Sequence, residues 1–215
     1  MKDISLIGFM GCGKSSVGKE LAALLPECGL IDLDAYIEER QGRSIPEIFN
    51  EHGEAAFRRM ERDALEEIFS DSERPCAILS LGGGTVTSER CRRLIRRHTE
   101  CFYLRATTAT LLDNLEGHSD GRPMLAVPAA GSTLAAESLP VAEPVEATVD
   151  DVRRCASTSS ATVLSSATEK REALRQRIET LMQARSSQYL ATAHHVIDID
   201  GQTFAQTAAI VKALL

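Results

Sequence analysis

Residues 8–15 read Gly8-Phe9-Met10-Gly11-Cys12-Gly13-Lys14-Ser15, which fits the pattern G-x-x-x-x-G-K-[ST] of a phosphate-binding loop. The apolar run Ile4–Ile7 precedes the loop and reads as a strand. The stretch Lys14–Leu25 follows it with apolar residues at helical spacing and ends before Pro26. Because the motif is diagnostic only between a strand and a helix, this context separates it from an ordinary glycine-rich turn.

The loop predicts how a nucleotide would bind. Glycines let the backbone wrap around phosphate oxygens, and the amides and the positive end of the following helix face the anion. Lys14 would reach the β- and γ-phosphates, and the Ser15 hydroxyl would ligate Mg²⁺. We expect Cys12 to contribute its backbone amide only. The predicted ATP-binding residues of the loop are Gly11, Cys12, Gly13, Lys14, Ser15 and Ser16.

Four further apolar runs lie downstream and read as strands. They are Leu30–Leu33, Ala77–Leu81, Cys101–Leu104 and Val196–Ile199, and helical patterns separate them. Strands that alternate with helices predict an α/β fold. We therefore expect a five-stranded parallel sheet flanked by helices on both faces, in a single domain spanning residues 1–215.

Two predicted helices carry recognisable starts. Ser44-Ile45-Pro46-Glu47 has the Ser-x-x-Glu form of a capping box with an early proline, and the apolar stripe of Glu54–Phe69 follows it. Ser88–Arg97 opens on a serine cap.

The composition excludes several classes of protein. The chain has 215 residues and a net charge of −7, which argues against nucleic-acid binding. No apolar run approaches the length that crosses a bilayer, so we expect no membrane association. The segment Met1–Gly8 has neither an extended apolar region nor a small-residue cleavage site, which predicts a cytoplasmic protein.

The cysteines predict neither a metal ribbon nor a disulfide framework, because they lie far apart and no C-x-x-C pair occurs. They are Cys12, Cys28, Cys76, Cys91, Cys101 and Cys155. We expect reduced, mostly buried thiols.

Residues 126–168 differ in character from the rest. This stretch is rich in Ala, Ser, Thr, Val and Pro, and it shows no sustained period of 2 or 3.6. Structureless stretches of this length are uncommon inside a compact domain. We interpret it as a poorly ordered, low-complexity insertion within a lid.

Missing motifs narrow the class of nucleotide-binding protein. No N-K-x-D segment of a GTPase and no L-S-G-G-Q-like signature of a transport ATPase is present. A kinase of small molecules or nucleotides remains.

Two carboxylates, Asp32 and Asp34, end the second predicted strand. In an open α/β sheet this edge borders the ligand crevice, and their i, i+2 spacing predicts that both lie on one side of the strand. The alternative is that Asp34, which is also suited to this position, caps the following helix.

Two further motifs contain an arginine that could bind an anion and three glycines that could let the backbone approach a ligand. Arg58 stands in Phe57-Arg58-Arg59-Met60-Glu61, where it either binds an anion or forms an i, i+3 surface pair with Glu61. Gly82, Gly83 and Gly84 follow the third predicted strand, either as a flexible turn or as a segment that leaves amides pointing at a ligand.

Two arginines come later in the chain. Arg122 lies in Gly121-Arg122-Pro123-Met124-Leu125. Arg185 lies on an otherwise apolar helical stripe that includes Tyr189, so it must bind an anion, extend to water or pair with an internal acid.

Together these motifs resemble the shikimate kinase family, over Asp3–Leu125 and again over about Glu169–Leu215. The resemblance implies the three-layer sandwich of P-loop, nucleoside-monophosphate-kinase-like proteins. It implies transfer of the γ-phosphoryl group of ATP to the 3-hydroxyl of shikimate, with one Mg²⁺ per subunit as cofactor and ATP as co-substrate. We expect a monomer.

The resemblance also implies the roles of the site residues. Lys14, Asp34 and Arg122 would be catalytic, with Asp34 hydrogen-bonding the substrate hydroxyls and Arg122 closing over the γ-phosphate of ATP. Asp32 would act through water on the Mg²⁺ held by Ser15. The shikimate-binding residues would be Asp34, Arg58, Gly82, Gly83, Gly84 and Arg185.

One position departs from the family pattern. Asn114 stands where the family usually has an arginine that packs on adenine. Two alternative functions stay open: another small-molecule kinase of this fold, such as a gluconate kinase, and a weakly active nucleotide-binding regulator, which Asn114 and the insertion close to Arg122 would both favour.

Overall fold

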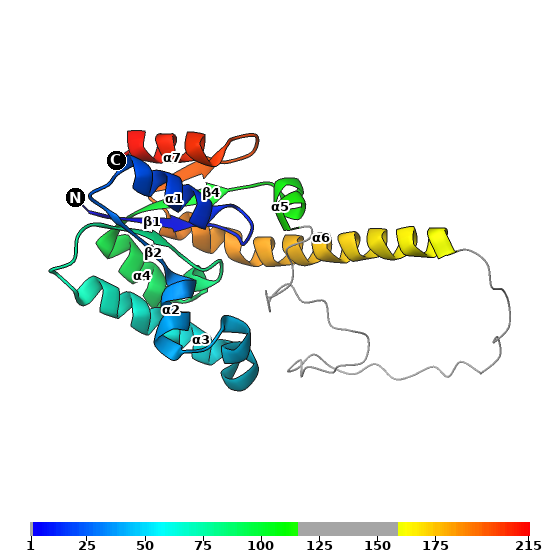
Figure 1. Ribbon diagram of the computed structural model, residues 1–215, viewed down its shortest axis with the longest axis horizontal. Helices are drawn as coiled ribbons and strands as arrows, with labels where there is room; N and C mark the ends of the chain where they lie inside the picture. The colour runs from blue at the N-terminus through cyan, green and yellow to red at the C-terminus, as the bar shows by residue number, and fades with distance from the viewer. Residues whose placement is uncertain (1, 116–158) are drawn as a thin grey trace.

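The computed structural model describes residues 2–115 and 159–215. This part of the chain contains a parallel five-stranded sheet in the order β2-β3-β1-β4-β5 (Figure 1). Each strand lies within two residues of its predicted bounds, and the expected α/β fold is confirmed. The strands are β1 Asp3–Ile7, β2 Gly29–Asp32, β3 Ala77–Ser80, β4 Thr99–Arg105 and β5 His195–Asp198.

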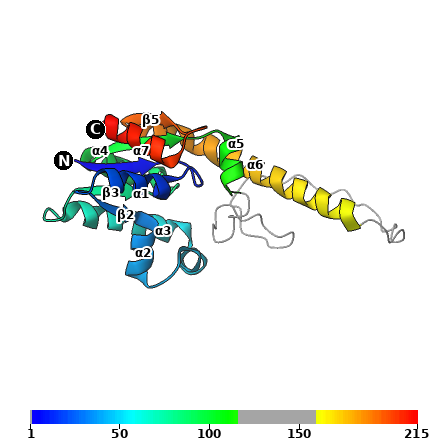
Figure 2. The ribbon, with the colours of Figure 1, turned by 45° about the horizontal axis from the view of Figure 1, so that its top comes forward.

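Helices cover both faces of the sheet, as Figures 1 and 2 show. They are α1 Lys14–Leu24, α2 Leu33–Gln41, α3 Ile45–Ser70, α4 Glu89–His98, α5 Thr108–Leu115, α6 Ser159–Thr192 and α7 Phe204–Ala213, with a short 3₁₀ turn, η1, at Thr85–Thr87. Helices α1 and α7 pack together on one face, and α4 and the carboxyl-terminal part of α6 pack on the other. The result is a three-layer sandwich.

The central strands are buried on both sides. Phe102 and Leu104 of β4 join the apolar cluster under α1 and α7, whereas Cys101 and Tyr103 join the cluster under α4 and α6. A parallel strand in this position presents apolar side chains in both directions and reads as a continuous apolar run. This is why the sequence pattern located the strands.

Helix α3 begins with the predicted capping box. The Ser44 amide donates to the Glu47 carboxylate at 2.8 Å, and Glu47 is held in turn by the Ser44 hydroxyl. Gly53 has φ of 73°, which bends the helix and divides it into two sections. The predicted helix Glu54–Phe69 is the second section. Helices α2 and α3 pack against each other at one side of the sheet (Figure 2).

Helix α6 begins inside the stretch interpreted as an unstructured insertion. Residues 159–168 are helical, and the helix extends beyond the sheet in Figure 1. The prediction missed this start because an Ala- and Ser-rich segment has no apolar period. Extending an established helix costs little compared with nucleating one. Residues 126–158 of the predicted insertion, and Arg122, lie outside the described residues.

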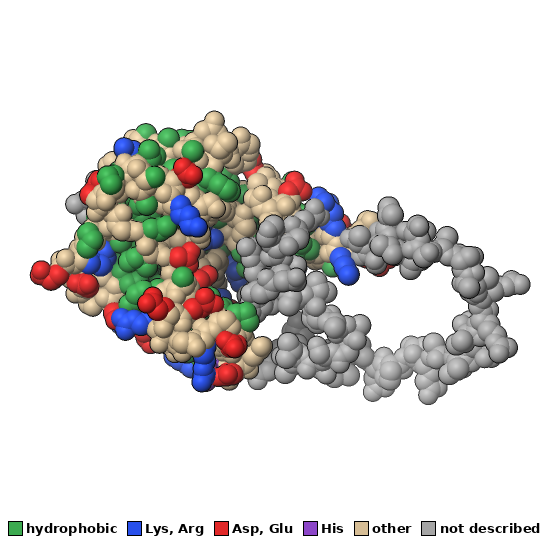
Figure 3. Space-filling model, in the orientation of Figure 1, with side chains coloured by type: hydrophobic (Ala, Val, Ile, Leu, Met, Phe, Trp, Pro, Cys, Tyr) green, Lys and Arg blue, Asp and Glu red, His purple; other side chains and the backbone are tan. Residues whose placement is uncertain are grey.

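Acidic and basic side chains are interspersed on the described surface that Figure 3 shows. Many of them pair, as Arg43 does with Glu51 and Arg105 with Asp198. Among the described residues, no helix is both long and apolar enough to traverse a bilayer.

Candidate active site

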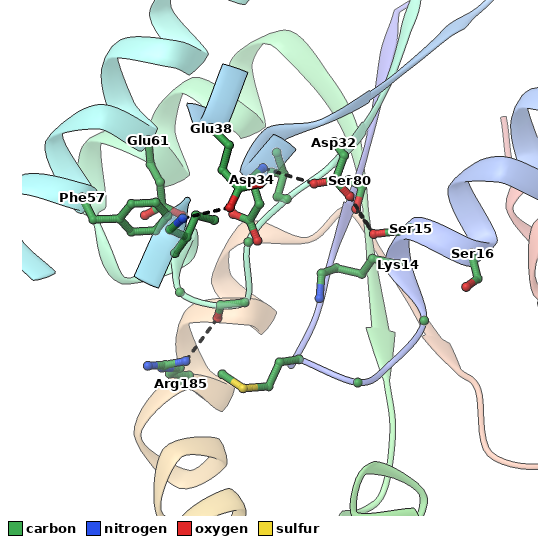
Figure 4. A pocket seen from close by; sticks show the side chains of 18 of the residues that line it. Lys14, Ser15, Ser16, Asp32, Asp34, Glu38, Phe57, Glu61, Ser80 and Arg185 are labelled. Carbon is green, nitrogen blue, oxygen red and sulfur yellow. Dashed lines mark hydrogen bonds between the residues drawn. The ribbon is translucent and has the colours of Figure 1, made fainter. Parts of the chain in front are cut away.

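A cavity of about 790 Å³ opens at the carboxyl ends of β1, β2 and β3 (Figure 4). The phosphate-binding loop, α2, α3, α6 and the loop after β3 all contribute to its walls. Its volume is in the range of small-molecule sites. In a parallel sheet this edge is where ligands bind, because the strands end there and the following loops can approach one another.

The phosphate-binding loop turns sharply before α1. Gly11 and Gly13 both have φ of 84°, a left-handed conformation that glycine adopts without steric cost. A Cβ at Gly13 would also overlap the ring of Phe204. Inside the loop, the Lys14 ammonium donates to the carbonyls of Gly8 at 2.9 Å and Phe9 at 3.1 Å. Lys14 is therefore buried within the loop that the sequence assigned to phosphate.

Ser15 connects the loop to the second strand. Its hydroxyl donates to Asp32 Oδ2 at 2.7 Å and lies 3.1 Å from the hydroxyl of Ser80 (Figure 4). The described residues contain no cluster of three or more His, Cys, Asp or Glu side chains arranged for a metal ion. A hydroxyl and a carboxylate at a phosphate loop still fit Mg²⁺, which prefers oxygen donors and completes its shell with water and substrate phosphates.

The two predicted carboxylates occupy different elements. Strand β2 ends at Asp32, and Asp34 lies in the first turn of α2, so they do not share one side of a strand as expected. Asp32, rather than Asp34, caps α2 by accepting from the amides of Asp34 at 3.1 Å and Ala35 at 3.4 Å. The chain changes from strand to helix at Leu33. The sequence did not indicate this change, because the apolar run continues to Leu33. Both carboxylates nevertheless line the cavity.

Asp34 has an unusual environment. Its Oδ1 atom is buried and has no hydrogen-bond partner among the described residues. Burial, followed by the nearby carboxylates of Glu61 and Asp32, raises the pKa of Asp34 from 3.8 to about 6, against the opposing effect of neighbouring cations. A buried acceptor without a partner is costly unless a ligand donates to it.

Arg58 points into the cavity from α3 and is held by two acids. It donates to Glu61 at 2.6 Å and to Glu54 at 2.9 Å. The predicted i, i+3 pair with Glu61 therefore exists, but it is not a surface pair, because the Glu61 side chain is 0% exposed and that of Arg58 only 15%. Three of the five guanidinium N–H groups are used in these contacts, which leaves two for a ligand.

The glycine loop after β3 lies against this arginine. A Cβ at Gly84 would overlap the guanidinium of Arg58, and a Cβ at Gly82 would lie 2.9 Å from carboxylate oxygens of both Asp34 and Glu61. Gly83 approaches the backbone amide of Met10 in the phosphate-binding loop. The three glycines thus allow two parts of the site to come close together, rather than forming a flexible turn.

Arg185 reaches the cavity from α6, on the same side as the glycine loop (Figure 4). It is 5% exposed and donates to the Gly83 carbonyl at 3.4 Å, a carbonyl that also accepts from the Tyr189 hydroxyl. Within residues 2–115 and 159–215 no acid forms an ion pair with Arg185, which lines the cavity instead. Its charge faces the cavity.

The cavity brings together most of the residues predicted from the sequence. They are Gly11, Gly13, Lys14, Ser15, Ser16, Asp32, Asp34, Arg58, Gly82, Gly83, Gly84 and Arg185. Cys12 does not line it: the side chain is fully buried, and the backbone amide donates to the Phe9 carbonyl at 3.2 Å.

Sequence reasoning missed several residues of the cavity wall. Ser80 lines the cavity from the end of the apolar strand β3. A single serine after an apolar run does not by itself indicate a binding residue. Phe204 comes from α7 and contacts the phosphate-binding loop at Gly13, which no local pattern indicates. Asn114 of α5, noted in the sequence only as a departure from the family pattern, also lines the cavity and donates to the Gly11 carbonyl.

Comparisons with known proteins agree with this geometry. The family model for shikimate kinase matches residues 10–170. The shikimate kinase of Enterococcus faecalis is 39% identical over 127 residues, which cover 59% of this chain and 73% of that protein. The shikimate kinase of Thermus thermophilus is 42% identical over 124 residues, or 58% of this chain and 65% of that protein.

A solved structure is similar as well. The shikimate kinase from Acinetobacter baumannii, determined in complex with shikimate, superimposes with a TM-score of 0.74 at 26% identity, and the match covers 100% of this chain and 92% of that one. Because the family model accounts for well over half of the sequence, the chain belongs to the shikimate kinase family.

Proposed function

We propose that this chain transfers the γ-phosphoryl group of ATP to the 3-hydroxyl of shikimate and so forms shikimate 3-phosphate. One observation carries the proposal: a single cavity joins a phosphate-binding loop, a buried carboxylate with an unpartnered oxygen, and two arginines. Phosphoryl transfer asks a protein mainly for alignment and neutralisation of charge, and this cavity supports both.

ATP would bind with its phosphates along residues 11–16. The amino-terminal end of α1 and the loop amides face that position. Lys14 would exchange its contacts with two loop carbonyls for the β- and γ-phosphate oxygens, which are stronger partners for an ammonium group. Ser15 would hold Mg²⁺ directly and Asp32 through water, and the cation would supply neutralisation of the phosphate charge.

The carboxylate of shikimate would be anchored by two guanidinium groups. Arg58 keeps two N–H groups free of its acidic partners, and Arg185 carries a charge that no described acid neutralises. A planar fork of donors suits a carboxylate better than the point charge of lysine does. Gly82, Gly83 and Gly84 would let the sugar-like ring lie against the backbone.

Asp34 would orient the acceptor hydroxyl. Its unpartnered Oδ1 atom supports a hydrogen bond from the substrate, and a pKa of about 6 leaves it ionised at neutral pH and close to the optimum for a base. As the 3-hydroxyl oxygen bonds to the γ-phosphorus, the bond to the β-phosphate oxygen breaks and ADP leaves. The hydroxyl proton passes to Asp34. Arg122 is proposed, from its motif alone, to stabilise the charge on the transferred group.

An ADP-release assay with shikimate, with gluconate and without acceptor tests the proposal. ADP production that depends on shikimate supports it. Turnover of gluconate alone would make the chain another small-molecule kinase. ATP binding without acceptor-dependent turnover would make the chain a nucleotide-binding regulator. Asn114, which replaces the family arginine, favours this alternative. We further propose, as the sequence leads us to expect, a monomer acting in the cytoplasm.

A further inference from the structure

The cavity extends along the phosphate-binding loop to a side chain that the proposed chemistry does not use. Phe204, the first residue of α7, lines the cavity, and its ring lies against Gly13. The side chain is 46% exposed. Single exposed apolar residues are ordinary on a protein surface. A ring that borders a ligand cavity at its phosphate loop is less ordinary, because a flat apolar face is then presented to whatever the loop holds.

The start of the helix that carries the ring is fixed by a capping box. The Thr203 hydroxyl accepts from the Gln206 amide at 3.2 Å, and the Gln206 side chain accepts from the Thr203 amide at 2.8 Å. This capping box fixes the start of α7. Helix α7 also packs along α1, which starts at the phosphate-binding loop. The backbone that carries the ring is therefore fixed relative to the phosphate-binding loop, which places the ring beside Gly13.

The neighbouring position strengthens the assignment. Asn114 also borders the loop, and its amide donates to the Gly11 carbonyl at 2.9 Å. An asparagine tied to the loop backbone offers no large face for a base. Among the cavity residues contributed by α5 and α7, which carry none of the proposed acid-binding groups, Phe204 alone has a π face.

We propose that Phe204 is the nucleobase platform of this enzyme and determines its preference among nucleotide donors. The inference rests on the proposed function in one respect, namely that the loop binds a nucleoside triphosphate. Stacking on an aromatic ring tolerates every base, because each base has a π face. We therefore expect GTP to serve as a donor alongside ATP.

Substitution of the ring tests the platform through KM. For Phe204→Ala we expect the KM for ATP to rise about tenfold, the loss expected for one base–aromatic stack, while the KM for shikimate stays within twofold. Phe204→Tyr should restore the KM for ATP, but Phe204→Leu should not, although leucine keeps apolar packing against Gly13. Ile210→Ala is the matched control, because Ile210 is an exposed apolar residue of the same helix that does not line the cavity.

Fluorescence separates the platform from phosphate binding. The chain contains no tryptophan, so Phe204→Trp introduces a single reporter. ATP and GTP should quench its emission, and inorganic tripolyphosphate should not. The platform would be overturned if calorimetry shows that Phe204→Trp binds ATP without a change in emission and that Phe204→Ala binds ATP as tightly as the unsubstituted chain. The proposed function would then still stand. Absence of both ATP binding and shikimate-dependent ADP release in the unsubstituted chain would overturn both.

A separate observation concerns two cysteines 48 positions apart in the sequence. Cys28 and Cys76 directly precede the paired strands β2 and β3, and the Gly29 amide donates to the Cys76 carbonyl at 2.8 Å. Their Sγ atoms lie 2.7 Å apart. A disulfide needs about 2.05 Å between sulfurs and neighbouring backbones at about 5–6 Å, which adjacent parallel strands provide.

We propose that Cys28 and Cys76 form an intramolecular disulfide when the protein meets a low-molecular-weight disulfide such as oxidised glutathione. The partly exposed Cys76 thiolate would attack that reagent and release one thiol. Cys28 would then attack the mixed disulfide, form the Cys28–Cys76 bond and release the second thiol. The two protons lost by Cys28 and Cys76 are taken up by the two departing thiolates, so no net proton is released. Burial, followed by the hydrogen bond from Cys28, raises the pKa of Cys76 to about 12, so the bond forms slowly at neutral pH.

Peptide mapping under non-reducing conditions tests the pair after prolonged incubation with oxidised glutathione. We expect one cross-linked peptide that contains both cysteines, and a Tm raised by roughly 5 °C or more. The Cys28→Ser variant should show neither the cross-link nor the higher Tm. Activity should stay within twofold, because the bond lies at the opposite end of the strands from the cavity. Fully reduced Cys28 and Cys76 after incubation, or cross-links to the buried Cys91 or Cys101 in their place, would overturn the proposal.

Discussion

Replacing Asp34 by asparagine should make the protein more stable and nearly inactive. The pKa of Asp34 is raised from 3.8 to about 6, chiefly by burial. An acid with a raised pKa in the folded state binds its proton more tightly there than in the unfolded chain. The folded state is therefore penalised by this group at neutral pH, and the penalty is lost as the pH falls from about 6 towards 3.8.

The two pKa values determine the size of the effect. At pH 7 the ionised side chain lowers the free energy of unfolding by up to about 3 kcal/mol, and at pH 4.5 by only about 1 kcal/mol. Asp34→Asn removes the charge at similar shape. The gain in stability should therefore be about 3 kcal/mol at pH 7 and clearly smaller at pH 4.5. Turnover should fall by at least about 100-fold, because the base that orients the hydroxyl is gone.

Urea denaturation at both pH values, with an ADP-release assay, measures these effects. Glu20→Gln is the matched control: it removes one exposed acid from α1 and should change the free energy of unfolding by less than about 0.5 kcal/mol. In the unsubstituted enzyme, kcat/KM for shikimate should fall about tenfold per pH unit below an apparent pKa of about 6. A gain in stability over the unsubstituted chain that is no larger at pH 7 than at pH 4.5, together with undiminished turnover, would refute the assignment of a buried, charged base.

Three further changes probe the rest of the site. Glu61→Gln removes a carboxylate that raises the pKa of Asp34, so the acidic limb of the pH profile should move to lower pH; an unmoved limb would show that the two acids are not coupled. Arg185→Lys should raise the KM for shikimate at least about tenfold, because lysine lacks the planar fork, and leave the KM for ATP within twofold; equal changes in both constants would contradict an acid-binding role. Replacing residues 127–158, the part of the predicted insertion before α6, with a short Gly/Ser linker should leave turnover within a few-fold, since loop-closure cost grows only logarithmically with length; loss of activity in a folded variant would count against a dispensable insertion.

Features that depend on neighbouring residues could be read from the sequence. The phosphate-binding loop, the capping box at Ser44 and the five strands all follow from residue types within a few positions of one another. Such features are controlled by local backbone conformation and by apolar runs that must be buried on both faces of the sheet. The gathering of Asp34, Arg58 and Arg185 was predicted only through the resemblance to a family.

Features that depend on distant segments required the fold. Burial raises the pKa of Asp34, and it turns the pair of Arg58 and Glu61 from a surface contact into a wall of the cavity. Neither is visible in a local pattern, because desolvation depends on every segment packed around a group. The contacts of Phe204 with Gly13 and of Cys28 with Cys76 likewise join elements whose sequence separation carries no information about their distance in space.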